Sequence, residues 1–202
     1  MRVLVAFEVS GIVRDAFRRC GHDAWSCDLL SPDDVPPGIL PNQLYPQFHI
    51  KADARDVMVL PGWDMMIAHP PCTYLTNAGV RWLHTQEGRW EKMKRDARLY
   101  ADVCNADIPR KAIENPVQHH YARAAHGCPP ANQYVHPWQH GYGETKATGL
   151  TLYNLPELIP TNVVDGRKPR VHREPPGEWR WLKRSLTCPG IAKAMAEQWG
   201  AL

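Results

Sequence analysis

The sequence predicts an α/β fold with a mostly parallel sheet and helices on both faces. Two observations support this fold class. Short apolar runs alternate with amphipathic helical stretches along the chain, and several of the runs end at a polar or glycine-containing turn. Strands that alternate with helices pair in parallel, because each connection crosses back over the sheet. With 202 residues, 44% of them hydrophobic, the chain suits a single domain, 1–202, around one sheet.

The first element of this pattern is a strand over residues 3–7 that ends near a Ser10-Gly11 turn. Apolar side chains then recur at helical spacing as far as Gly21, which ends that helix. The proline-rich stretch 31–47 interrupts the alternation and predicts a long surface loop. By the same reasoning we expect strands over 24–27, 49–53, 63–68, 111–113, 133–135 and 148–153, and helices over 87–105 and 190–199.

Composition and charge narrow the class of protein. No apolar run approaches the roughly 18 to 20 residues that span a bilayer, so we expect a cytoplasmic protein with no membrane partner. The six cysteines contain no CxxC pair, which favours reduced thiols and predicts neither a disulfide framework nor a metal site. The net charge of +3 is too small to indicate nucleic-acid binding. Charge is concentrated in residues 166–184, the basic segment, which has seven Lys or Arg, two Glu and two Trp.

Polar residues at the ends of strands are the first candidates for function, because open parallel sheets bind ligands beyond the carboxyl ends of their strands. Asp28 ends the second predicted strand and can accept hydrogen bonds from ribose hydroxyls. Gly11 follows the first strand and would let the backbone approach a ligand closely. Together these two residues predict a cofactor that contains adenosine.

Pro70-Pro71-Cys72 is the sharpest candidate for catalysis. Two successive prolines fix the backbone and place one thiol in a loop at the sheet edge, so we interpret Cys72 as a nucleophile. A thiolate that adds to an aromatic ring needs a second group to stabilise the ring nitrogen, and Glu114 ends a neighbouring strand. The alternative interpretation, a small buried apolar side chain, is kept for Cys20, Cys27 and Cys104.

The order of these motifs resembles the DNA cytosine carbon-5 methyltransferase family. That family has a glycine-bearing cofactor loop after strand one, an acid after strand two, an Asp after strand three, Pro-Cys after strand four and Glu-Asn after strand five. The resemblance covers roughly residues 1–155, and its most specific part is the Pro-Pro-Cys and Glu-Asn pair, about forty residues apart. The matching motifs are Val9-Ser10-Gly11, Asp28, Asp53, Pro70-Pro71-Cys72 and Glu114-Asn115.

This resemblance implies a Rossmann-like, S-adenosylmethionine-dependent methyltransferase fold and methyl transfer from S-adenosyl-L-methionine to carbon 5 of cytosine in DNA. Cys72 would add to carbon 6 of the ring, and Glu114, with a pKa raised by partial burial, would be protonated beside ring nitrogen 3. A base inside duplex DNA would have to be flipped out first. The cofactor would contact Phe7, Ser10, Gly11, Asp28, Asp53 and Pro70, with Asp28 on the ribose and Asp53 on the adenine amino group.

The sequence departs from the family pattern in three places. Val13 and Arg14 stand where the cofactor loop usually has further glycines, and 143–148 replaces a pair of arginines. Lys146 remains there as a third catalytic residue, able to contact the cytosine carbonyl or a phosphate as a point charge. Only about 35 residues lie between the strand predicted over 148–153 and the final helix, too few for a target-recognition domain. The expected substrate contacts are Pro71, Asn115, Thr148, Arg167, Lys168 and Arg170.

The basic segment stands where that domain would lie, and two roles fit it. It could bind backbone phosphates and stack on bases, or it could be a solvated loop whose tryptophans pack on the core. A homodimer or a separate recognition partner would also supply the missing domain.

Other functions fit part of the same sequence. The same chemistry could act on a free cytosine nucleotide or on single-stranded DNA. A degenerate fold could bind nucleic acid or a protein partner without catalysis. A zinc-dependent deaminase would need a second cysteine at position 75, which is Leu.

Overall fold

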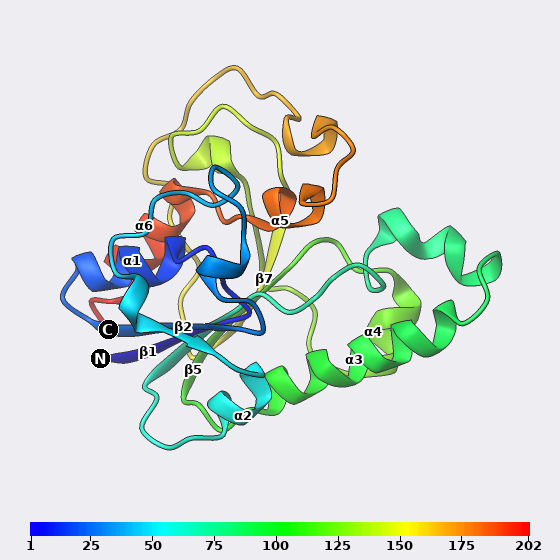
Figure 1. The fold of residues 1–202 in the computed structure, drawn as a ribbon, viewed down its shortest axis with the longest axis horizontal. Helices are drawn as coiled ribbons and strands as arrows, with labels where there is room; N and C mark the ends of the chain where they lie inside the picture. The colour runs from blue at the N-terminus through cyan, green and yellow to red at the C-terminus, as the bar shows by residue number, and fades with distance from the viewer.

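The computed structural model, which describes residues 1–202, has a seven-stranded sheet between two layers of helices (Figure 1). The strands lie in the order β3-β2-β1-β4-β5-β7-β6. Strands β1 to β5 pair in parallel, whereas β7 runs antiparallel to β5 and to β6. The predicted mostly parallel sheet is therefore confirmed. The strands are β1 Arg2–Ala6, β2 Asp23–Asp28, β3 His49–Lys51, β4 Met65–Ala68, β5 Arg110–Asn115, β6 Gln133–Val135 and β7 Thr148–Tyr153.

Helices cover both faces of the sheet (Figure 1). Helices α1 (Ile12–Arg19) and α6 (Pro189–Trp199) pack on one face, and α2 (Ala54–Met58), α3 (Arg89–Asn105) and α4 (His120–His126) on the other. Strand residues alternate between the two layers, so Val3 and Val5 of β1 meet α1 and α6 while Leu4 faces the α3 side. None of these helices combines the length and the apolar composition that crossing a membrane requires.

The predicted strands and helices are present, with ends that differ by at most two residues. The strand expected over 49–53 ends early because Asp53 becomes the N-terminal cap of α2, where its carboxylate accepts a hydrogen bond from the Arg55 amide at 2.9 Å. Elements absent from the sequence prediction are α2, α4, α5 (Arg180–Ser185) and the 3-10 helices η1 (Pro32–Asp34), η2 (Pro46–Phe48), η3 (Asn77–His84), η4 (Pro137–Gln139) and η5 (Val171–Arg173).

A buried arginine fastens the proline-rich loop 31–47 to the sheet. Arg14 has no exposed surface, and its guanidinium contacts Asp15 Oδ1 at 2.7 Å, Ser26 Oγ at 2.9 Å and Gln43 Oε1 at 2.9 Å. The other Asp15 oxygen accepts a hydrogen bond from the Leu44 amide at 2.6 Å. The loop therefore closes over α1 and β2 through one ion pair and its hydrogen bonds.

Replacing Arg14 with Met should lower the free energy of unfolding by about 3–5 kcal/mol, because it leaves the buried Asp15 carboxylate without its cation. Urea unfolding measures this loss. The matched control is Lys193→Met, which breaks the exposed Lys193–Glu197 pair and should change the free energy by less than about 1 kcal/mol. Equal losses in the two variants would show that Arg14 does not hold this loop.

Candidate active site

One large cavity opens at the carboxyl ends of β1, β2 and β4, the edge where ligands of parallel sheets bind. Its volume is about 1030 Å³, at the upper end of the roughly 300–1,000 Å³ range of small-molecule sites. Helix α3 forms one wall, and α5 with the residues that follow it forms the opposite wall. The cavity is large enough for a cofactor together with part of a substrate.

Five of the six predicted cofactor contacts line this cavity: Phe7, Ser10, Asp28, Asp53 and Pro70. Asp28 ends β2 and accepts a hydrogen bond from the Leu30 amide at 3.0 Å, and burial raises the pKa of its carboxyl. Asp53 is already engaged by the Arg55 guanidinium, at 2.6 Å for the closest pair of atoms, which lowers the Asp53 pKa. Asp28 is therefore the freer of the two acids for a ligand.

The sixth predicted contact, Gly11, does not line the cavity. It caps α1 with a φ of 69°, a conformation that disfavours other residues. A side chain here would also collide with the Arg14 guanidinium and Gln43. The positive φ and the packing of Arg14 are thus sufficient to require glycine at this position, and the cofactor contact expected of Gly11 stays a prediction.

Glu8, which the sequence analysis did not single out, occupies the N-terminus of α1. Its buried carboxylate accepts hydrogen bonds from the Val13 amide at 2.7 Å, the Arg14 amide at 3.2 Å and the Ser10 hydroxyl at 3.2 Å. Burial raises its pKa, although these donors and His69 oppose the shift. The turn after β1 thus offers the cavity a carboxylate instead of free N–H groups. The position of a charged residue directly after an apolar strand could have identified Glu8 from the sequence.

Cys72 lies in the turn after β4 and lines the same cavity. Its carbonyl accepts hydrogen bonds from the amides of Leu75 at 3.0 Å and Thr76 at 3.2 Å, so the chain turns tightly behind Pro71, which also lines the cavity. Burial and the charge of Glu114 raise the pKa of the thiol. Without a ligand Cys72 is therefore a neutral thiol at neutral pH.

Glu114 forms a buried ion pair with His69. His69 Nδ1 donates to Glu114 Oε2 at 2.7 Å, and the two side chains are 13% and 10% exposed. Burial alone would raise the pKa of Glu114, but the cations of His69 and Lys146 outweigh it and hold that pKa at about 2. The raised pKa predicted for Glu114 is therefore wrong, because a neighbouring cation stabilises the carboxylate.

Lys146 lies close enough to this pair to act on it electrostatically. Its Nζ donates to the Leu186 carbonyl at 3.0 Å, which ties the residues after α5 to the site. Its charge lowers the pKa of both Cys72 and Glu114. Arg184 of α5 also lowers the pKa of Cys72. Of the predicted catalytic residues only Cys72 lines the cavity; Glu114 and Lys146 do not, although their charges, with that of Arg184, act on the Cys72 thiol.

Asn115 and Thr148 do not contact the large cavity. Neighbouring residues of a strand face opposite sides of the sheet, so Asn115 lines a separate small cavity with Gln118 and Thr151. Both polar atoms of its buried side chain lack a partner. Thr148 is buried on β7 opposite Val135. Asn115 and Thr148 thus lie outside the large cavity, and the substrate contacts expected of them stay a prediction.

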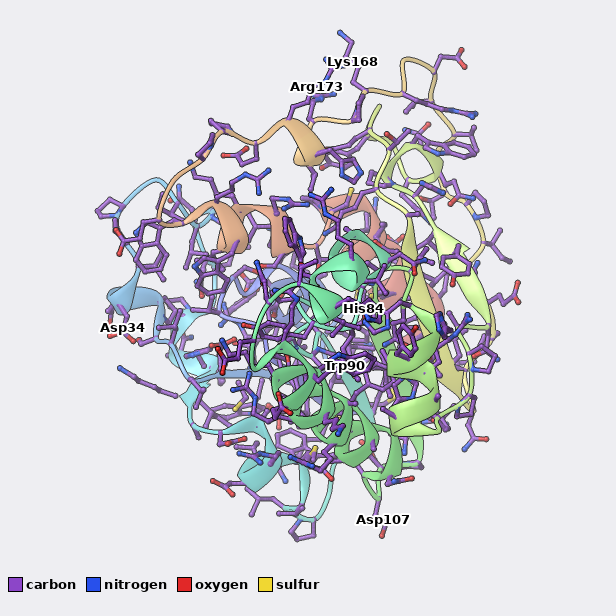
Figure 2. The ribbon with its side chains drawn as sticks, turned by 90° about the vertical axis from the view of Figure 1, so that its right-hand side faces the viewer. Asp34, His84, Trp90, Asp107, Lys168 and Arg173 are labelled. Carbon is purple, nitrogen blue, oxygen red and sulfur yellow. The ribbon has the colours of Figure 1, made fainter.

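The basic segment divides into two parts. Arg167, Lys168 and Arg170 lie outside the cavity lining, and Figure 2 shows Lys168 and Arg173 projecting outward at one end of the molecule. Its second part forms α5, which sequence reasoning missed, and whose Trp181 is 57% exposed and lines the cavity. Arg167, Lys168 and Arg170 are therefore not part of the cavity wall, whereas residues of α5 are, and the substrate contacts expected of these three residues stay a prediction.

Among solved structures, the chain is similar to Entamoeba histolytica methyltransferase EhMeth, with a TM-score of 0.51 and 13% sequence identity. The match covers 80% of this chain and 57% of EhMeth. The chain has a methyltransferase fold. The resemblance inferred from the motifs is thus confirmed at the level of the fold.

Two further structures are similar to the methyltransferase fold of this chain. An Escherichia coli prophage DNA modification methyltransferase matches with a TM-score of 0.47 and 14% identity over 81% of this chain and 51% of its own. A Spodoptera frugiperda DNMT2 mutant matches with a TM-score of 0.41 and 13% identity over 87% and 60%. The chain therefore spans between half and three fifths of the length of all three proteins. No family model and no curated protein matches the sequence.

Replacing Lys146 with Met should raise the pKa of Cys72 further, because it removes a cation that favours the thiolate. Alkylation of Cys72 by iodoacetamide at about pH 8 should slow about tenfold for each unit of increase. Mass spectrometry of the peptide that contains Cys72 follows the reaction. Lys193→Met, which removes an exposed cation on α6, is the control, and equal rates in both variants would contradict the assignment.

Proposed function

We propose that this protein is a methyltransferase that uses S-adenosyl-L-methionine to methylate carbon 5 of cytosine in DNA through a covalent adduct with Cys72. The observation that carries the proposal is the position of Cys72, which shares one cavity with Asp28, Phe7 and Pro70. A nucleophile and a cofactor site in one cavity are what group transfer to a bound ring requires.

The side chains of the cavity fit this cofactor. Glu8 and Asp28 give one end of the cavity carboxylates, which complement the positive sulfonium and ammonium groups of S-adenosylmethionine. Asp28 would hold the ribose hydroxyls, while Phe7 and Pro70 would pack against apolar parts of the ligand. When bound, S-adenosylmethionine supplies the methyl group as an electrophile.

Cys72 would act on the cytosine ring as a thiolate. It forms a bond to carbon 6, and the displaced electron pair makes carbon 5 able to accept a methyl group. Once carbon 5 carries the methyl group, its proton passes to water, the electron pair of that carbon–hydrogen bond forms the 5,6 double bond, the bond between sulfur and carbon 6 breaks, and the thiolate is restored. Lys146 and Arg184 favour the thiolate at the first step.

DNA is proposed as the substrate on the motif resemblance and on the charge of the basic segment. Exposed Trp181 on the cavity wall offers a surface on which a base can stack. Arg167, Lys168 and Arg170, which lie farther out, would contact backbone phosphates without reading sequence. In this arrangement α5 would contact the base, and the residues before α5 would contact the phosphates.

The protein should transfer a tritiated methyl group from S-adenosylmethionine to DNA that contains cytosine, and Cys72→Ser should abolish the transfer while cofactor binding persists. DNA in which 5-fluorocytosine replaces cytosine should become covalently attached to Cys72, because fluorine blocks the final proton loss. Scintillation counting and mass spectrometry of the adduct are the measurements.

The same assay distinguishes the substrates. Parallel reactions contain duplex DNA, single-stranded DNA or deoxycytidine nucleotides, and label in the nucleotide alone would replace DNA with the free nucleotide. Transfer by Cys72→Ser at the rate of the unaltered protein would overturn the covalent mechanism.

Asp28→Ala should weaken binding of S-adenosylmethionine about ten- to hundredfold, since losing a hydrogen-bond partner in a buried site costs roughly 1–3 kcal/mol. Isothermal titration calorimetry measures the affinity. Asp33→Ala, in the η1 turn outside the cavity, is the matched control. Unchanged affinity in Asp28→Ala would place the cofactor elsewhere.

A further inference from the structure

We propose that His69 is a positioning residue that supplies, through Glu114, the proton that the cytosine ring takes up when Cys72 adds to it. This inference rests on the proposed function and assigns a role to a residue outside the motifs of the sequence analysis. The proton would thus come from His69, the residue hydrogen-bonded to the Glu114 carboxylate, and not from Glu114 itself.

The geometry of a relay is present in the folded chain. Strands β4 and β5 pair with Ala68 opposite Ile113, so the next residues, His69 and Glu114, are neighbours at the sheet edge. Because a carboxylate only accepts hydrogen bonds, the 2.7 Å contact requires a proton on His69 Nδ1. The Thr187 side chain, which lines the cavity, also hydrogen-bonds Glu114, and the charge of Glu114 acts on the Cys72 thiol.

The charges around His69 favour its imidazolium form. Burial alone would lower its pKa, but Glu114 on β5 and Glu8 on the turn after β1 outweigh both burial and Lys146, so the pKa is raised. Nε2 is buried and has no hydrogen-bond partner. The proton on Nδ1 is therefore held by the Glu114 carboxylate, and the charge of Glu8 acts in the same direction.

Glu114 cannot store that proton itself. A carboxyl with a pKa of about 2 is ionised at neutral pH, whereas the cytosine ring needs a proton as negative charge reaches nitrogen 3. A carboxylate that passes on a proton from a neighbouring imidazolium meets this need without being protonated beforehand.

One proton moves from His69 to the cytosine ring and returns during each methyl transfer. As the thiolate of Cys72 bonds to carbon 6, His69 Nδ1 transfers its proton to Glu114 Oε2, the now neutral carboxyl group turns about its Cγ–Cδ bond, and the same oxygen passes that proton to ring nitrogen 3. The products are a neutral imidazole, the Glu114 carboxylate and a protonated ring nitrogen. When the bond between sulfur and carbon 6 breaks, the proton returns along the same path and the imidazolium is restored.

The first test uses the unaltered protein. Transfer requires Cys72 as thiolate and His69 as imidazolium together, so the rate rises with pH only up to the pKa of His69. Above it, each gain in thiolate is offset by a loss of imidazolium, and the rate levels off. We expect the break in log kcat against pH to coincide with the His69 pKa measured by nitrogen-15 NMR titration of labelled histidine.

The second test replaces His69 with Asn, whose amide can donate the same hydrogen bond to Oε2 but cannot release a proton. The proton must then be stored on Glu114, so the break should move about two pH units toward acid, the difference between ordinary His and Glu side chains. The plateau in kcat should fall about tenfold for each pH unit of that movement, with KM little changed.

His140→Asn is the matched control, because His140 is also buried and bonded through Nδ1, to Thr161 Oγ1 at 3.1 Å, but lies outside the cavity. Its profile should match that of the unaltered protein. A His69→Asn profile that also matches would overturn the relay and leave the proposed methyl transfer intact. A break in the unaltered protein that does not coincide with the His69 pKa would overturn it even if His69→Asn fails to fold. No methyl transfer by the unaltered protein to any cytosine substrate would overturn the proposed function, and the relay with it.

Discussion

The contact between His69 Nδ1 and Glu114 Oε2 joins the ends of β4 and β5, and the arrangement of the site depends on it. Parallel strands in register bring their polar end residues together at one edge. Buried charges persist there only when they are paired. Lys146 is a second cation near Glu114, and its hydrogen bond to the Leu186 carbonyl connects the residues after α5 to the site. The ion pair and this hydrogen bond thus connect β4, β5, the residues before β7 and the residues after α5 that line the cavity.

The turn after β1 also buries charged side chains in pairs and hydrogen bonds. Val13 and Arg14 stand there in place of the glycines of the family's cofactor loop. A glycine-rich loop leaves the N–H groups of the next helix free for a ligand, whereas here Glu8 accepts the amides of Val13 and Arg14. Arg14 is in turn buried beneath the loop 31–47, which its contact with Gln43 holds in place. The altered loop is therefore a closed hydrogen-bond network that leaves a carboxylate at the cavity.

Local patterns predicted the sheet, because the end of an apolar run is visible in the sequence and marks Asp28, Cys72 and Glu114 as strand-end residues. The short helices were not predictable in this way. Helix α5 has six residues and buries only Leu182, too little for a helical period to emerge. The pairing of His69 with Glu114 joins residues 45 apart and needs the strand register. The face of Asn115, by contrast, follows from alternation with Glu114.

The two parts of the basic segment have different surroundings in the folded chain. Before α5 its cations lie away from the cavity, and Arg167 stacks on Trp138 at 3.7 Å, which leaves this part suited to a surface contact with phosphates. Within α5, Arg184 acts on the Cys72 thiol and Trp181 reaches the cavity. Binding a base in DNA needs both contacts to the phosphate backbone and a surface against which the base packs. On the proposed function, this chain would divide those tasks between two neighbouring stretches of about ten residues each, which favours contact with a base and its adjoining phosphates over readout of an extended sequence.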